Sequence, residues 1–186
     1  LIDCGEGTQE RLRMAGVNFN RIGRIFISHM HGDHYLGLMG LLSSMHLQGR
    51  SRELHVHGPA DLKEVVHLQL RVSQTYLRYP MHIHAVASVS GEVIMEDDRV
   101  TVTALALKHR LPCTGLVVKE RAGLRSLRKE MLPVIPAYRR AGVKQGEDLV
   151  AEDGTVIPNA ELTLDPPARR SYAFCSDTAY APELVP

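Results

Sequence analysis

The hexapeptide HMHGDH at residues 29–34 follows a short β-branched run and precedes a helical pattern. Imidazole and carboxylate groups are the usual protein ligands of Zn²⁺. Burying four such groups without a metal would leave unpaired polar atoms, which is unfavourable. Four ligands this close together suggest two ions, with His29 and His31 facing one metal while Asp33 and His34 reach a neighbouring one. The hexapeptide therefore predicts a metal site in a strand-to-helix loop.

Strand and helix patterns alternate along the rest of the chain, which favours an α/β fold. Two further metal-ligand types, His109 and Asp177, follow predicted strands, and strand-to-loop exits are where sites of α/β folds gather. Both are therefore candidates to complete the metal site. Strands are expected at 24–28, 53–57, 82–87, 92–95, 99–107, 114–118 and 171–176, and helices at 6–15, 36–47 and 59–72.

The 22 basic and 21 acidic residues nearly cancel, so net charge neither requires nor excludes a nucleic-acid partner. Local charge is uneven, because residues 119–145 carry eight Lys and Arg against two Glu, whereas residues 147–165 carry six acidic residues and no Lys or Arg. Several prolines also interrupt this stretch, which favours an inserted arm at about 119–170. A solvated basic surface is the alternative. The candidate RNA-contacting residues are Arg125, Arg128, Lys129, Arg139, Arg140 and Lys144.

The three cysteines lie far apart without a CxxC pair, which fits reduced thiols in a cytoplasmic protein better than disulfides. No apolar run approaches the ~18 residues of a membrane helix, and no signal-peptide pattern opens the chain. We therefore expect a soluble, unexported protein without a membrane partner or a nucleotide cofactor. The chain begins with Leu1 in what resembles the second half of a strand and stops soon after another strand. A fragment of a longer protein is the expectation.

HMHGDH after a strand resembles the metallo-β-lactamase superfamily, and three other stretches resemble ribonuclease Z more narrowly: LIDCGEGTQ at 1–9, LKHRLPCTGLVV at 107–118 and FCSDTAY at 174–180. The resemblance implies a single, partial αββα domain over residues 1–186 with two Zn²⁺ ions per active site. It places His29, His31 and His109 on one zinc, Asp33 and His34 on the other, and Asp177 on both. Asp33 would also orient or deprotonate the attacking water.

The same resemblance implies an endoribonuclease that removes the 3′ trailer from precursor tRNA and leaves a tRNA 3′-hydroxyl, by attack of a metal-activated hydroxide without a covalent enzyme intermediate. The arm would clamp the elbow of the tRNA, and the protein would be a homodimer. In place of the Gly-Pro-rich element of many family arms, this chain has only LPVIP at 132–136. Histidines that the family carries further downstream are not in the sequence, so the fragment alone is expected to bind metal and can be inactive.

Two other functions fit the same residues. One is a different hydrolase of the superfamily, acting on small phosphodiesters, aryl sulfates or thioesters. The other is a catalytically incomplete, metal-stabilised RNA-binding module. The native metal also stays open, because Zn²⁺, Mn²⁺ and Fe²⁺ accept similar ligands. Two HxH pairs, His55 with His57 and His82 with His84, are expected to pack or lie on the surface because neither has a carboxylate cluster nearby.

Overall fold

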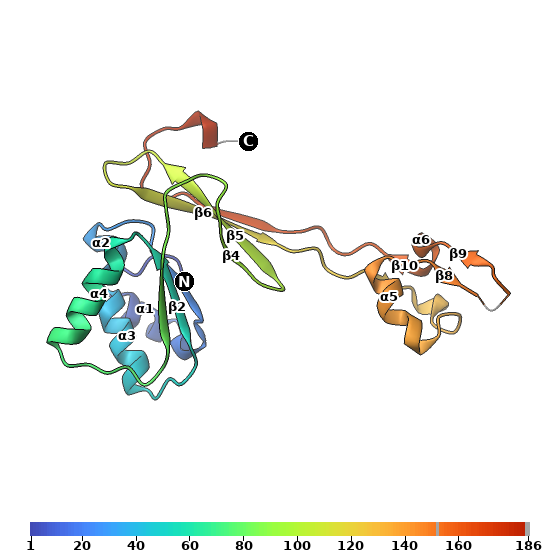
Figure 1. The fold of residues 1–186 in the computed structure, drawn as a ribbon, viewed down its shortest axis with the longest axis horizontal. Coiled ribbons are helices and arrows are strands. Elements are labelled where there is room, and N and C mark those ends of the chain that lie inside the picture. Colours follow the sequence, from blue (N-terminus) through green and yellow to red (C-terminus); the bar gives the residue numbers. More distant parts are fainter. Residues whose placement is uncertain (152, 185–186) are drawn as a thin grey trace. The chain divides into compact units, whose positions relative to one another are not determined.

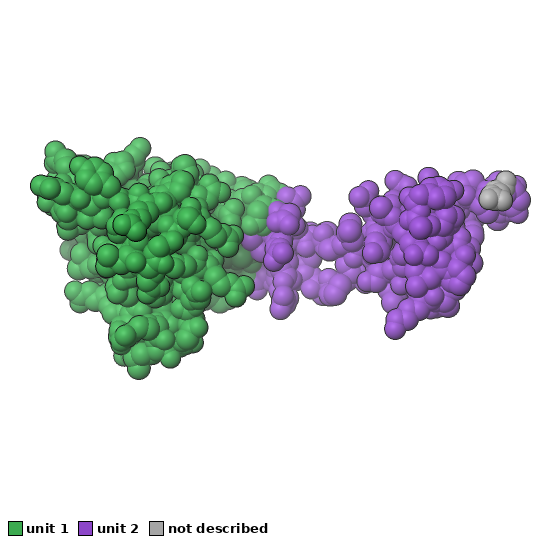
Figure 2. All heavy atoms as spheres, turned by 90° about the horizontal axis from the view of Figure 1, so that it is seen from below, with its two compact units in different colours: residues 1–97, 101–118, 172–186 green, residues 98–100, 119–171 purple. Residues whose placement is uncertain are grey.

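The computed structural model describes residues 1–151 and 153–184. The chain divides into two compact units, shown in Figure 2. The first comprises residues 1–97, 101–118 and 172–186, and the second comprises residues 98–100 and 119–171. Apart from residues 98–100, the second unit occupies the interval in which the sequence predicts an inserted arm. Residue 152 of that interval lies outside the described residues.

Three parallel strands form the first sheet of unit 1, in the order β1-β2-β3 (Figure 1). Ile2 adds a parallel bridge to Phe26 at the β1 edge. Parallel neighbours need crossover connections, and helices supply them here, α3 between β1 and β2 and α4 between β2 and β3. The elements are α1 (Thr8–Met14), β1 (Arg24–Phe26), α3 (Leu38–Leu47), β2 (Leu54–Gly58), α4 (Asp61–Val72) and β3 (Met81–Ala85).

A second sheet, most of whose residues belong to unit 1, has the strand order β11-β6-β5-β4. Its strands are β4 (Val93–Glu96), β5 (Val100–Leu107), β6 (Cys113–Glu120) and β11 (Ser171–Phe174), and β4 pairs with β5 antiparallel. Phe26 of the first sheet packs with Val102 and Leu116 of the second in one buried cluster. A backbone bond from the Thr114 N–H to the Ser28 carbonyl, 3.0 Å long, also joins the two halves. The two sheets therefore face each other.

The first sheet buries its other face against helices. Because side chains alternate across a strand, Ile25 and Val56 point away from Phe26 and join Leu41 and Met45 of α3 in the largest core cluster, in which these four side chains are fully buried. The described residues of unit 1 thus form a helix layer and two facing sheets. This arrangement confirms the predicted α/β fold class and provides three layers of the expected αββα sandwich.

Unit 2 has a small core of its own, formed by Ile135, Val143, Leu149 and Leu162. Asn159 is buried beside them, and its amide group donates to the carbonyls of Val143 and Glu147 at 2.7 and 2.8 Å. The elements of this unit are β7 (Ser126–Leu127), η2 (Lys129–Met131), η3 (Ala137–Arg139), α5 (Arg140–Gln145), β8 (Leu149–Val150), β9 (Val156–Ile157), α6 (Asn159–Leu162) and β10 (Thr163–Leu164), with β7 paired to β10 and β8 paired to β9. The short elements of unit 2 therefore share a buried core of their own.

All the predicted elements of unit 1 are present, with shifted ends. The first helix begins at Thr8 rather than at residue 6, because Gly7 has a left-handed φ of 74°. The helix predicted at 36–47 begins at Leu38, because the Gly37 N–H donates to the Cys4 carbonyl. Before it lies a separate short helix, α2 (Gly32–Tyr35), which the sequence did not predict. No helix among the described residues combines the length and apolar character needed to cross a bilayer.

Candidate metal centre

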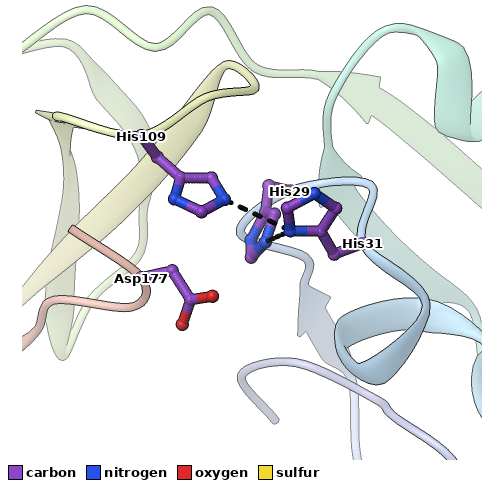
Figure 3. Close-up of side chains that lie close together, drawn as sticks. All are labelled: His29, His31, His109 and Asp177. Atoms are coloured by element: carbon purple, nitrogen blue, oxygen red, sulfur yellow. Dashed lines mark hydrogen bonds between the residues drawn. The ribbon is translucent and has the colours of Figure 1, made fainter. Parts of the chain in front are cut away.

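Three loops at the carboxyl ends of strands bring four metal-ligand side chains together (Figure 3). His29 and His31 lie in the loop between β1 and α2, His109 follows β5, and Asp177 follows β11. His31 Nδ1 lies 2.9 Å from His29 Nε2 and 3.2 Å from His109 Nε2. One donor atom from each of the four residues lies within 4.8 Å of the other three. Side chains up to 148 residues apart thus converge on one point.

This donor set fits a divalent transition metal. Three imidazole nitrogens and one carboxylate are ligands that Zn²⁺ accepts in a tetrahedral arrangement. The His29 side chain is fully buried, so its ring nitrogens have no access to bulk water. A cation at the centre of the group would satisfy lone pairs that otherwise face one another. The residues present therefore fit a metal ion.

Asp33 and His34 lie beside this group, on α2. His34 Nε2 is 3.4 Å from Asp33 Oδ2 and 3.8 Å from Asp177 Oδ1. The rings of His29 and His34 are 4.1 Å apart between centroids. The side chain of Asp33 is 78% exposed, so water and ligands can reach its carboxylate. Asp177 is therefore near both the three-histidine group and the pair on α2.

Asp3 orients His34, and the sequence analysis does not identify it as a site residue. Its Oδ1 accepts the Ser28 N–H at 2.7 Å, and its Oδ2 accepts the Ser28 hydroxyl at 2.9 Å. Oδ2 also lies 2.8 Å from His34 Nδ1. A carboxylate accepts only, so Nδ1 carries the proton and Nε2 presents its lone pair to the site. A carboxylate in this position fixes the ring and increases its basicity as a ligand.

The electrostatic surroundings of His29 and His34 differ. Burial lowers the pKa of His29, and repulsion by His34, His31 and His109 lowers it further. Burial also acts to lower the pKa of His34, but the hydrogen bond and charge of Asp3, with the charges of Asp33 and Asp177, outweigh it and raise that pKa overall. His29 therefore favours the neutral form, which is the form that binds metal.

Two glycines allow the N-terminal loop to approach the metal-binding loop. A Cβ on Gly5 would lie 2.0 Å from the Asp33 carbonyl oxygen, and a Cβ on Gly37 would lie 1.9 Å from the Gly5 carbonyl oxygen. No larger side chain fits at either position without a backbone shift. Gly5 and Gly37 therefore have a packing role, because they let the N-terminal loop lie directly against the segment that carries Asp33 and His34.

Arg110 is a second residue that the sequence reasoning missed. Its exposed guanidinium Nη2 donates to His31 Nε2 at 3.0 Å, at the outer side of the three-histidine group. The only signal in the sequence is its place directly after His109. The six predicted metal-site residues, by contrast, all lie in this region of unit 1.

The chain is similar to several known proteins. A family model described as "Anti-Pycsar protein Apyc1" matches residues 1–125. Ribonuclease Z from Bacteroides fragilis is 42% identical over 189 residues, which cover 100% of this chain and 62% of the relative. Ribonuclease Z from Nostoc is 40% identical over 188 residues, 100% of this chain and 58% of the relative. The crystal structure of human tRNase Z, short form, matches with a TM-score of 0.58 and 30% identity over 63% of this chain and 52% of the human one.

The fold and the site define a metallo-β-lactamase-type protein with a His/Asp group that could hold a metal ion. The chain belongs to the family that the Apyc1 model describes. The relatives from Bacteroides fragilis and Nostoc, which match this chain from end to end, are named ribonuclease Z. The resemblance carried by the four sequence motifs is thereby confirmed. The chain spans about 60% of the length of these curated relatives, with 62% of one and 58% of another covered.

Proposed function

We propose that this chain is the larger part of a zinc-dependent endoribonuclease that removes the 3′ trailer from precursor tRNA. The observation that carries the proposal is the convergence of His29, His31, His109 and Asp177 in a chain whose full-length homologues are named ribonuclease Z. The similarity to those homologues continues through unit 2, whereas the Apyc1 model stops at residue 125. Unit 2 therefore favours the tRNA-processing activity over other reactions.

We assign His29, His31 and His109 to one zinc, Asp33 and His34 to a second, and Asp177 to both. The position of Asp177 supports the shared role, because its carboxylate belongs to the three-histidine group and also lies 3.8 Å from His34 Nε2. Bound zinc would supply a Lewis acid that stabilises charge on the phosphoryl oxygens and makes water a nucleophile near neutral pH. His34 is held for this task by Asp3.

Two exposed side chains would act on the substrate. Asp33 is the proposed proton acceptor for the attacking water, and its carboxylate is exposed beside His34. Arg110 would bind a phosphate oxygen of the RNA, since a guanidinium suits phosphate geometry. When His31 presents Nδ1 to a metal, its Nε2 carries the proton and no longer accepts from Arg110. The guanidinium is then free to meet the substrate.

Unit 2 would be an arm that binds the tRNA away from the cleavage site, and its six candidate residues are not equivalent. Arg125 donates from Nε to Thr163 Oγ1 at 2.6 Å and pairs with Asp165, while Arg140 donates to the carbonyls of Ile135 and Leu132. These two arginines stabilise the unit itself. Arg128 lies at 4.0 Å from Glu130. Lys129, Arg139 and Lys144 are therefore the better candidates for phosphate contacts.

A cleavage assay on precursor tRNA carrying a 3′ trailer tests the proposal. The full-length protein should release a tRNA with a 3′-hydroxyl, and His109→Ala should lower the rate by more than about 100-fold. His67→Ala, a histidine change on the exposed face of α4, is the matched control and should leave the rate unchanged. An intact metal centre without any cleavage of precursor tRNA would reject the assignment.

A different phosphodiesterase is the second candidate, and one observation favours it. The Apyc1 model covers residues 1–125, which contain His29, His31 and His109 but not Asp177 and little of unit 2, so most of the candidate ligands lie in a part that matches without the arm. Replacing residues 124–165 by a short Gly-Ser linker separates the two candidates. A tRNA-processing enzyme should lose cleavage of precursor tRNA while keeping hydrolysis of bis-p-nitrophenyl phosphate. Equal retention of both activities would favour the small-substrate reaction.

We also propose that the protein is a cytoplasmic homodimer. Exposed apolar side chains at the ends of α3 and α4 and in the segment after α4 support a contact between copies through Leu47, Val72 and Tyr76. The three cysteines are free thiols, which supports a reducing compartment. Light scattering of the purified full-length protein tests the dimer, and a Leu47→Glu, Tyr76→Glu double variant should shift it to the monomer.

A further inference from the structure

Four histidines line one face of the first sheet, outside the candidate metal centre. In the parallel pairing of β2 with β3, His55 lies opposite His82 and His57 lies opposite His84. His55 Nδ1 is 2.9 Å from His84 Nε2, and the rings of His55 and His82 are 5.0 Å apart. The sequence alone favours packing or surface roles for these residues. The register of two parallel strands instead gathers both HxH pairs into one cluster.

A carboxylate completes this cluster. Glu53, directly before β2, places Oε2 at 3.6 Å from His55 Nε2 and at 3.8 Å from His82 Nε2. These two imidazoles are the ion-pair partners that Glu53 has among the described residues. Two imidazole nitrogens therefore face a single carboxylate oxygen. The expectation of packing or surface roles rests on the lack of a carboxylate cluster, and one carboxylate, that of Glu53, lies beside these histidines.

The closeness of Glu53 to both imidazoles would let the three side chains turn onto one metal ion. Among the described residues, only the group of His29, His31, His109 and Asp177 already has all its ligand atoms within 4.8 Å of one another, so a metal would have to draw the two imidazoles of this cluster together. With metal–ligand bonds of about 2.0–2.1 Å in a tetrahedral site, donor atoms lie about 3.3 Å apart, a few tenths of an ångström closer than the contacts to Glu53. Half of the His82 side chain and 65% of that of Glu53 are exposed, so both can turn to close the site. His84 would not bind the metal. Its Nε2 would accept a hydrogen bond from the His55 Nδ1–H, which orients His55 Nε2 toward the metal.

The cluster is distinct from the candidate metal centre. His29 follows the carboxyl end of β1, whereas Glu53 precedes β2 and His82 is the second residue of β3, at the amino ends of their strands. In a parallel sheet the amino ends of the strands lie together at one end of the sheet, and the carboxyl ends lie at the opposite end. The nearby positive charge of Arg24 lies 3.6 Å from Asp97, which offsets it. A cation at Glu53 thus has its own ligands and its own access to solvent.

We propose that His55, His82 and Glu53 form a second, surface site for a divalent transition metal such as Zn²⁺, with His84 positioning His55. The site holds one ion and completes its coordination with water. It binds independently of the catalytic reaction, because none of its residues belongs to the loops of the candidate metal centre.

Equilibrium dialysis against Zn²⁺ with metal analysis tests this site in the full-length holoprotein. The protein should take up one equivalent beyond the ions that it retains after exhaustive dialysis. Glu53→Gln and His82→Ala should each weaken this extra binding at least tenfold, and His84→Gln should weaken it by about tenfold. His67→Ala is the matched control. Long-range ¹H–¹⁵N spectra should show a shift of His55 Nε2 on titration.

The outcomes separate this site from the proposed function. All four variants should keep the retained ions and the cleavage of precursor tRNA, and their exposed positions should leave the fold intact by circular dichroism. Equal uptake by wild type, Glu53→Gln and His82→Ala, or no extra equivalent in the wild type, would overturn the site. If the wild-type protein did not cleave precursor tRNA, only the proposed catalytic function would be rejected, because the test of this second site measures zinc uptake.

Discussion

The carboxylate of Asp3 lies 2.8 Å from Nδ1 of His34, and the same group accepts two hydrogen bonds from Ser28. The N-terminal loop therefore orients a candidate metal ligand that lies 31 residues further along the chain. Asp3 has a φ of 51°, a left-handed conformation that aspartate and asparagine tolerate better than most residues. This tolerance makes asparagine the suitable replacement for a test.

Asp3→Asn should lower metal affinity or activity by about 10–100-fold, because it removes the charge that orients His34 and increases its basicity. Competition with a chelator measures the affinity, and thermal unfolding of the metal-free protein reports on the fold. An unchanged affinity in a folded variant would show that Asp3 has only a structural role.

Gly37→Ala should destabilise unit 1 by about 1–3 kcal/mol or more, because the new Cβ would overlap the Gly5 carbonyl oxygen. Gly23→Ala is the matched control, since nothing lies within 4 Å of a Cβ at Gly23. That change should be neutral or slightly stabilising. Urea unfolding of the two metal-free variants measures the difference, and equal stabilities would contradict the close approach.

The three thiols should react at very different rates. Burial raises the pKa of Cys4 and of Cys113 to about 11, so both remain protonated at pH 8. Cys175 is exposed. Ellman's reagent should therefore titrate one thiol quickly in the native protein and three in urea, and Cys175→Ser should abolish the fast phase. Fast reaction of all three native thiols would contradict the buried positions.

His57 should make the protein less stable in acid. Its ring is buried between Phe26 and His84, and neither ring nitrogen has a hydrogen-bond partner among the described residues. Burial, followed by repulsion from His84, His55 and Arg24, lowers its pKa to about 4. The unfolded chain takes up this proton near pH 6.5 while the folded chain does not, so stability falls as pH decreases from about 6.5 to about 4.

The loss of folding stability that arises from the lowered pKa of His57 should reach about 2 kcal/mol by pH 5. His57→Phe keeps an aromatic ring against Phe26 and removes the titrating group, so its stability should fall less between pH 7 and pH 5. Urea unfolding of both proteins in the presence of chelator measures the difference, and the shared contribution of the other histidines cancels. Parallel losses in the two proteins would show that His57 titrates normally.

Much of the fold and of the candidate site was predictable from the sequence. HMHGDH identified one loop directly, because four ligands lie within six residues. His109 and Asp177 were predictable because each follows a recognisable strand in a stretch that resembles ribonuclease Z. The short helix α2 was missed because its four residues are too few to show a helical period.

Contacts that depend on strand register were not predictable. Asp3 meets His34 only because Ile2 pairs with Phe26 at the edge of the sheet. Likewise, Glu53 and the two HxH pairs come together only because β2 and β3 align after a helical crossover. Sequence spacing carries no information on such an alignment. Arg110 has no motif of its own, and its role follows from its contact with His31.

The central claim is that side chains from position 29 to position 177 hold one metal centre. A crystal structure of the zinc-loaded full-length protein, with anomalous differences measured at the zinc edge, tests it most directly. We predict an anomalous peak about 2.0–2.2 Å from His29 Nε2, His31 Nδ1, His109 Nε2 and an Asp177 oxygen. A zinc ion bound in the 29–34 loop with His109 or Asp177 beyond bonding distance would contradict the account.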